Sequence, residues 1–206
     1  MKIWVRFALV LALLALPGGA AFAKKGGGAP TTPGKYTDWD GEMDQLEVVA
    51  AFKLGDYDRI LVEPLETSGI ELPDIKDNTY GPVKQVLAEA AKPLGSGIAE
   101  ISPPDVLIGK LEKPESGALV VHARVVKMDP GSQAARYWAG FGVGAAKTGI
   151  EGDVRDSRTG KVLLRFKQER RSAVGSYGGD YEDLLNRNVW TIGKDLANVL
   201  QHFDTH

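Results

Sequence analysis

The chain has 206 residues, of which 43% are hydrophobic and 25% are charged, with a formal net charge of −2 and no cysteine. The lack of cysteine excludes disulfide bonds and acylation at a cysteine, so we do not expect a lipoprotein. The slight acidic excess argues against nonspecific binding of nucleic acid, which requires a basic face.

The first 23 residues have the features of a secretory signal peptide. Lys2 and Arg6 form a basic start, residues 7–16 form a short apolar run, and Ala21 and Ala23 supply the small residues of a cleavage site. The run is too short to span a bilayer as a helix, and an uncleaved anchor is the alternative. We therefore predict a secreted, periplasmic protein.

Residues 24–38 are rich in glycine, proline and threonine, and Tyr36 is their only large apolar residue. This composition is typical of a disordered leader. The remaining residues, 39–206, are numerous enough to bury one core without disulfides, so we expect a single domain over this range.

The first regular elements are short. Apolar residues recur at helical spacing between residues 41 and 54 and Gly55 follows, which predicts a short helix, with a strand over 48–52 as the alternative. Residues 59–64, RILVEP, form an apolar run closed by a proline and predict the first core strand.

A helix is predicted after the capping candidates at 77–79, and Pro93 and Gly95 are expected to end it. Its apolar face consists of Val83, Leu87, Ala90, Ala91 and Leu94. Residues 95–117 hold several prolines and predict mostly loop, with a brief strand at 106–108. The alternating run 118–128 predicts the strongest strand of the chain.

A hairpin follows whose register can be predicted. If residues 158–160 form a three-residue loop with Gly160 in the left-handed conformation, Val154 faces Leu164 on the buried side. Asp153 then faces Arg165 and Glu151 faces Lys167 on the solvent side. A slip of one residue would separate these charges, so the pattern favours one register.

The last predicted element is an amphipathic helix that begins after a cap at Asp180, with Asp183 in its first turn. Packing of its apolar stripe on the sheet is favoured over a coiled coil, because the stripe covers less than three heptads. The stripe consists of Leu185, Val189, Ile192, Leu196, Val199 and Phe203. The element order predicts an α+β domain with an antiparallel sheet of about four strands and helices packed on one face.

A glycine-rich segment precedes the hairpin. Gly140, Gly142 and Gly144 alternate with larger residues and predict a close approach of backbone. Their spacing matches a dinucleotide-binding loop, but a strand pattern follows where the phosphate-binding helix should begin, so we expect no nucleotide and no other cofactor. Self-association or membrane insertion of residues 137–146 is the alternative to a glycine-rich bend.

Arg136, Tyr137 and Trp138 stand directly before these glycines. Arginine and large aromatic residues contribute more binding energy than other residue types, so we predict partner contact through these three residues together with Gly140, Gly142 and Gly144. The alternative is that Tyr137 and Trp138 cover the core beside the hairpin.

The sequence holds no recognisable catalytic or metal-binding pattern. His122, His202 and His206 are dispersed, and no serine stands in a nucleophile-elbow context. Asp38, Asp40 and Asp44 lack the glycine and the bidentate glutamate of a calcium loop. We therefore expect no enzyme and no metal, with a hydrolase of envelope material as the least favoured alternative.

Four stretches together resemble the bacterial family called domain of unknown function 4410: DPGSQAARYWAGFGVG, the hairpin DSRTGKVLLRF, the GGD before the last helix and the upstream YDRILVEP. The resemblance covers residues 57–203. The matching residues are Asp129, Gly131, Ser132, Arg136, Tyr137, Gly140, Gly142, Gly144, Asp156, Thr159 and Gly160. It implies an exported cell-envelope protein and brings no catalytic role, and the missing lipidation cysteine departs from the many lipoproteins of the family.

The favoured hypothesis is a noncatalytic periplasmic binding or assembly module that contacts an envelope protein. Homo-oligomer formation or peripheral membrane association through the glycine-rich segment is the second hypothesis. The excess of acidic residues argues against a nucleic-acid partner.

Overall fold

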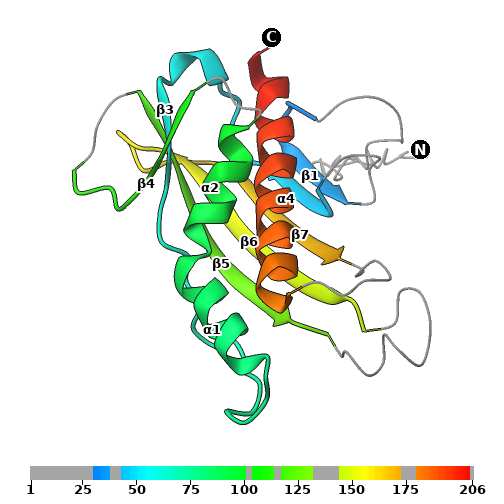
Figure 1. Cartoon of the computed structure of the whole chain (residues 1–206). Helices are drawn as coiled ribbons and strands as arrows, with labels where there is room; N and C mark the ends of the chain where they lie inside the picture. Colours follow the sequence, from blue (N-terminus) through cyan, green and yellow to red (C-terminus); the bar gives the residue numbers. More distant parts are fainter. Residues whose placement is uncertain are drawn as a thin grey trace, which may run out of the picture.

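One mixed sheet with helices against one face organises the protein in a computed structural model (Figure 1). The structure describes residues 30–37, 43–100, 104–113, 117–131, 144–172 and 180–204. The strands are β1 (Gly34–Thr37), β2 (Gln45–Val48), β3 (Arg59–Val62), β4 (Asp105–Ile108), β5 (Ala118–Asp129), β6 (Ala146–Asp156) and β7 (Val162–Ser172). The helices are α1 (Tyr80–Glu89), α2 (Ala91–Ala99) and α4 (Tyr181–Gln201), with short 3₁₀ turns at Leu54–Asp56 and His202–Asp204.

The sheet corrects the predicted fold. Its seven strands have the order β1-β2-β7-β6-β5-β3-β4, and β3 runs parallel to both β4 and β5. The predicted antiparallel sheet of about four strands is therefore wrong. The physical reason is that α1 and α2 form a crossover between β3 and β4, which brings the chain back to the sheet in the same direction.

The N-terminal residues contribute two strands where the sequence predicts none. β1 lies within the expected leader, and β2 lies within the predicted helix 41–54, which is wrong. Leu46 and Val48 are buried whereas Gln45 and Glu47 are not, so the segment follows the period of a strand. Tyr36 of β1 is buried in the core, and its hydroxyl donates to Thr32 O at 2.8 Å.

The helix predicted after residues 77–79 ends at Glu89, before its expected end, and a second helix follows it directly. After Ala90 the chain starts α2, which includes both Pro93 and Gly95. A proline is tolerated in the first turn of a helix, because the N–H groups there have no intrahelical acceptor. Pro93 lies in that first turn, so it does not end the helical run.

The β6–β7 hairpin has the predicted register. Val154 pairs with Leu164, Asp153 with Arg165 and Glu151 with Lys167, which confirms the charge pairs expected on the solvent side. The prediction holds because a slip of one residue would expose the apolar face and also separate the charge pairs, so both faces favour this register.

The turn of this hairpin is one residue longer than predicted. The N–H of Asp156 donates to Lys161 O at 3.0 Å, so Asp156 rather than Ser157 closes the loop. Asp156 Oδ1 accepts from Thr159 N at 2.7 Å and from Thr159 Oγ1 at 2.6 Å. Gly160 has φ +68°, the left-handed conformation that the sequence predicts. The extra residue is absorbed by a register shift between Val154 and Arg155.

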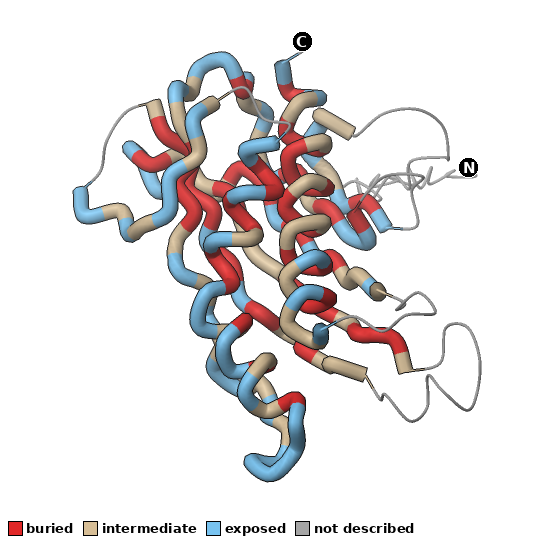
Figure 2. The backbone as a smooth tube through the Cα atoms, in the orientation of Figure 1, coloured by how far each residue is buried: buried red, intermediate tan, exposed pale blue. Residues whose placement is uncertain are grey.

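The core lies between the sheet and the helices, where buried residues of both layers face each other (Figure 2). The predicted apolar stripe is confirmed, because its five members on α4 and Phe203 in the 3₁₀ turn after it are each at most 2% exposed. Burial of one such aliphatic side chain stabilises the fold by about 1.5–3 kcal/mol. The cap is also confirmed, since the Asp180 side chain accepts from Glu182 N at 3.3 Å.

Candidate interaction surface

The face of the sheet opposite the helices carries charged side chains arranged in rows. Val121, Ala123 and Val125 of β5 point into the core, so the alternating residues His122 and Arg124 point away from it. The strand registers place the charges of β1, β2, β7, β6 and β5 in one row: Lys35, Glu47, Arg165, Asp153 and His122. Opposite charges therefore alternate across β1, β2, β7 and β6, and the imidazole of His122 on β5 follows Asp153.

Side-chain contacts connect the neighbours in this row. Arg165 Nη1 donates to Glu47 Oε2 at 3.0 Å, and Lys35 Nζ lies 3.9 Å from Glu47 Oε1. Asp153 accepts from Arg155 Nη2 at 2.8 Å and lies 4.0 Å from His122 Nδ1. The hydrogen bonds that Arg155 donates to Asp153 raise the pKa of Arg155 and keep it charged.

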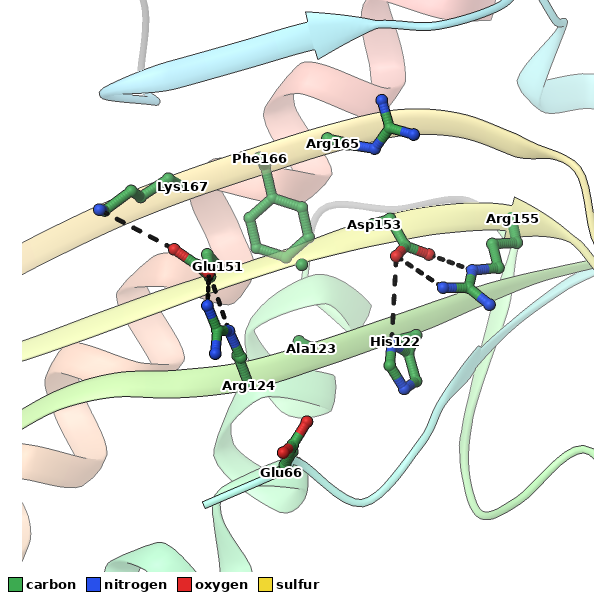
Figure 3. A pocket seen from close by; sticks show the side chains of 11 residues that line it. Glu66, His122, Ala123, Arg124, Glu151, Asp153, Arg155, Arg165, Phe166 and Lys167 are labelled. Atoms are coloured by element: carbon green, nitrogen blue, oxygen red, sulfur yellow. Dashed lines mark hydrogen bonds and ion pairs between the residues drawn. The ribbon is translucent and has the colours of Figure 1, made fainter. Parts of the chain in front are cut away.

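A second row lies beside the first. Glu151 of β6 accepts from Arg124 Nε of β5 at 2.8 Å, and its other oxygen lies 3.8 Å from Lys167 Nζ of β7. Figure 3 shows Glu151 between these two cations and Asp153 beside His122 and Arg155. The parts of the two rows on β5, β6 and β7 line an open pocket of about 340 Å³.

These charges mostly neutralise one another. Opposite charges on adjacent strands are typical of an antiparallel sheet with one solvated face. We therefore assign the charged face primarily to solubility and strand register. A recognition site requires exposed groups whose possible hydrogen bonds or apolar contacts are not all made within the fold.

Such groups occur at the far end of β5. Residues 69–74, which follow β3, and residues 126–130 at the end of β5 line a groove of about 560 Å³. Within it, Leu72 is 40% exposed, and the nearby Ile75 is 74% exposed. Exposed aliphatic side chains beside a groove are a feature of protein interaction sites.

The base of the glycine-rich segment adjoins this groove. Gly131 follows the groove residue Pro130 and contacts the backbone of Gly144. A Cβ on Gly131 would lie 2.1 Å from Gly144 O, and both glycines have positive φ, 74° and 75°. The predicted close approach of backbone is thus present at Gly144. The other predicted contact residues, Arg136, Tyr137, Trp138, Gly140 and Gly142, lie outside the described residues.

A buried polar cluster between α4 and β7 was missed by sequence reasoning. Asp195 is 5% exposed and accepts from Gln168 Nε2 at 3.0 Å and Arg170 Nε at 2.6 Å. Burial raises the pKa of Asp195, although hydrogen bonds from Arg170 and Gln168 oppose this effect. The signal in the sequence was an acidic residue between Ile192 and Leu196 on the apolar side of the helix. The cluster fixes α4 on the sheet.

Three further properties of the described residues concern metal binding, ionisation and membrane crossing. Within the described ranges, no three histidine, aspartate or glutamate side chains are placed so that they could hold a metal ion together. Burial, followed by the effect of Asp156, raises the pKa of Tyr57 to about 12, so this phenol stays protonated. None of the helices in the described part of the chain is long and apolar enough to cross a membrane.

Comparison with known proteins agrees with the family resemblance. Residues 96–176 match the model of a family described as domain of unknown function (DUF4410). This region contains β4 to β7, and the match confirms the resemblance stated from the sequence over these residues. A comparison with curated proteins gives no match.

Several solved structures are similar to part of this chain. The PelC dodecamer from Paraburkholderia phytofirmans is 13% identical with a TM-score of 0.48, covering 73% of this chain and 96% of that chain. Protein XCC0632 from Xanthomonas campestris is 7% identical with a TM-score of 0.44, covering 70% and 84%. A putative neuraminyllactose-binding hemagglutinin homolog from Helicobacter pylori is 11% identical with a TM-score of 0.38, covering 75% and 95%. At these identities and scores the likeness carries no argument about function.

Proposed function

We propose that this protein is a noncatalytic binding module of the bacterial cell envelope, exported to the periplasm, that holds another envelope protein at the end of β5. The observation that carries the proposal is the groove between residues 69–74 and 126–130. Its volume of about 560 Å³ is within the range of ordinary binding sites.

The apolar residues at the groove support this role. Ile75 and Leu72 expose 74% and 40% of their surface, although the same fold buries many other aliphatic residues almost completely. Burial of a side chain of this size contributes about 1.5–3 kcal/mol, so a partner that covers both residues gains a substantial part of its binding free energy there.

The position of the glycine-rich segment also supports the proposal. Arg136 follows Gly131 by five residues, and a fully extended chain advances at most about 3.6 Å per residue. Arg136, Tyr137 and Trp138 can then contribute to the same interface.

A photo-crosslinking residue at position 72 or 75 tests the proposal in intact cells. Both positions should give an adduct with the same envelope protein. Leu107 of β4, which is 48% exposed and lies outside the groove, provides the matched control and should not give this adduct. Identical products at all three positions, or no product at 72 and 75, would contradict the proposal.

A double variant tests the contribution of the glycine-rich segment. Arg136→Ala combined with Trp138→Ala should abolish the adduct at position 72 and leave the thermal midpoint nearly unchanged. A large fall in the midpoint would instead assign these residues to the core. Circular dichroism on the purified variant distinguishes the two outcomes.

Self-association is a second candidate, favoured by the apolar surface of β4. This strand ends the sheet, and its Leu107 and Ile108 are each 48% exposed. An edge strand with exposed aliphatic residues can pair with another chain. Sedimentation of the wild-type protein and of Leu107→Lys tests this: an oligomer that the substitution dissociates supports it, and a wild-type monomer rules it out.

A further inference from the structure

We propose that the partner adds an extended segment as a new strand along β5 at residues 126–129, and that this segment alternates basic with aliphatic residues. The inference rests on the proposed function and specifies the chemistry of the partner at the groove. Three features of the described residues carry it: a strand edge, an alternation of faces and an excess of negative charge.

The strand edge arises because β5 is longer than its neighbour on one side. β3 pairs with β5 only as far as Val121, and a single bridge follows between Glu66 and Arg124. There, Glu66 N donates to Ala123 O at 3.0 Å, and Val125 N donates to Glu66 O at 2.9 Å. The chain after Glu66 then turns, with Ile70 N donating to Thr67 O.

Beyond Val125, β5 continues to Asp129 with β6 on its other side. Within the described part of the chain, no strand pairs with residues 126–129 on the side of the groove. Backbone N–H and C=O groups at such an edge bind water in the free protein and can bind an added strand instead. Four residues at about 3.3 Å each give an open edge about 13 Å long. The pairing of β2 with β7 also extends over four residues, so an edge of this length is sufficient for strand pairing in this sheet.

The two faces of this edge differ in chemistry. A register shift between Val125 and Lys127 keeps Met128 in the core, 5% exposed, and leaves Lys127 and Asp129 less buried. Successive side chains of an added strand point to opposite faces. One set would meet the apolar side of the groove, where Ile70 and Leu72 lie, and the other set would meet charged groups. An alternating segment fits both faces.

The negative charge of the groove favours basic residues at the polar positions of the added segment. Glu71, Asp74 and Asp129 line the groove, and its one lining cation among the described residues, Lys127, donates from Nζ to Glu169 Oε2 at 3.1 Å. Burial opposes ionisation of Glu169, but the hydrogen bonds from Lys127 and Arg171 outweigh it and lower the pKa of Glu169. Lys127 is therefore already neutralised. The remaining carboxylates attract basic side chains and increase the rate of encounter with them.

Fluorescence anisotropy with the mature protein, residues 24–206, tests this inference. The probe is a fluorescein-labelled eight-residue peptide of alternating lysine and valine. We expect saturable binding, with affinity at least tenfold lower for a peptide of alternating glutamate and valine. A lysine and valine peptide with N-methyl groups on alternate amides should also bind at least tenfold more weakly, because N-methylation removes the donors of an added strand.

Protein variants and amide exchange locate the site. Asp74→Lys should weaken binding of the lysine and valine peptide at least tenfold, whereas Glu112→Lys, an exposed change of equal charge away from the groove, should not. Bound peptide should slow amide exchange at residues 126–129.

The inference fails if the peptide does not bind, if the N-methylated peptide binds equally well, or if slow exchange appears at β4 instead. Persistence of the crosslinks at positions 72 and 75 in that case would preserve the proposed function and reject only strand addition. Absence of the crosslinks would reject the proposed function itself.

Discussion

Gly97 of α2 and Gly193 of α4 touch where the two helices cross. A Cβ on Gly193 would lie 3.1 Å from Gly97 Cα and 2.2 Å from Leu94 O. A Cβ on Gly97 would lie 2.0 Å from Trp190 O. The backbones of the helices are therefore in direct contact, and only glycine permits this approach at both positions.

Gly97→Ala should destabilise the protein by at least about 2 kcal/mol, because the helices must separate to admit a methyl group. Urea denaturation followed by circular dichroism measures the change. Gly81→Ala in α1 is the matched control, since a Cβ there has no atom within 4 Å. Alanine has the higher helix propensity, so this variant should gain up to about 1 kcal/mol. Equal effects of the two substitutions would contradict the tight crossing.

Asp195→Ala should lower the free energy of unfolding by about 2–3 kcal/mol. The substitution removes the acceptor of the charge-assisted hydrogen bonds from Arg170 and of the hydrogen bond from Gln168. The free energy of unfolding in urea measures the loss. Arg170→Met should restore part of the stability in the Asp195→Ala background. A double-mutant cycle without coupling between the two positions would refute a direct interaction.

Asp156 should make the stability depend on pH in the acid range. Hydrogen bonds from Thr159 lower the pKa of Asp156 below its ordinary value of 3.8. Since the pKa in the folded state is lower than in the unfolded state, this contribution is fully present above about pH 4. It is lost as the pH falls through the lowered pKa. Asp156→Asn should be less stable at pH 7 by about 1 kcal/mol and should show a smaller loss of stability below pH 4.

Thermal unfolding of the wild type and Asp156→Asn at intervals from pH 2 to pH 7 measures this difference. Asp183→Asn is a suitable control, because Asp183 is exposed on α4 and lies outside the turn. Parallel pH curves for the wild type and Asp156→Asn would show that Asp156 does not stabilise the turn as an anion.

Arg165→Glu should destabilise the sheet by about 1 kcal/mol, because residue 165 lies between Glu47 and Asp153 in the cross-strand row. The loss should be smaller in 1 M NaCl, where charges are screened over about 3 Å. Adding Glu47→Lys should restore part of the stability. An effect independent of salt would indicate altered packing.

The elements predicted correctly are those whose evidence is local. In the β6–β7 hairpin, one turn glycine, one buried face and two charge pairs agree. In α4 and the 3₁₀ turn after it, six apolar residues share one stripe. β1 and β2 have four residues each, too few for a period to be recognised. The parallel arrangement of β3 was missed because nothing in the residues 59–62 specifies their neighbours.

The groove could not be predicted for a related reason. Its two sides, residues 69–74 and 126–130, are remote in sequence and carry no motif of their own. The family resemblance includes the residues directly after the second side, from Gly131 to Gly144. Leu72 on the first side and the adjacent Ile75 are recognisable as interaction residues only from their exposure in the folded protein.

The pairing of β2 with β7 has a consequence for the order of folding. Gln45 pairs with Lys167, so the N-terminal β1–β2 pair gains its place in the sheet only when almost the whole chain has been synthesised. Contacts between such distant residues form slowly, because a long loop must close first. Until then the apolar residues Leu46 and Val48 have no strand to cover them. The sheet of this protein therefore closes late in synthesis. Until it closes, β1 and β2 are the strands that most need protection from aggregation.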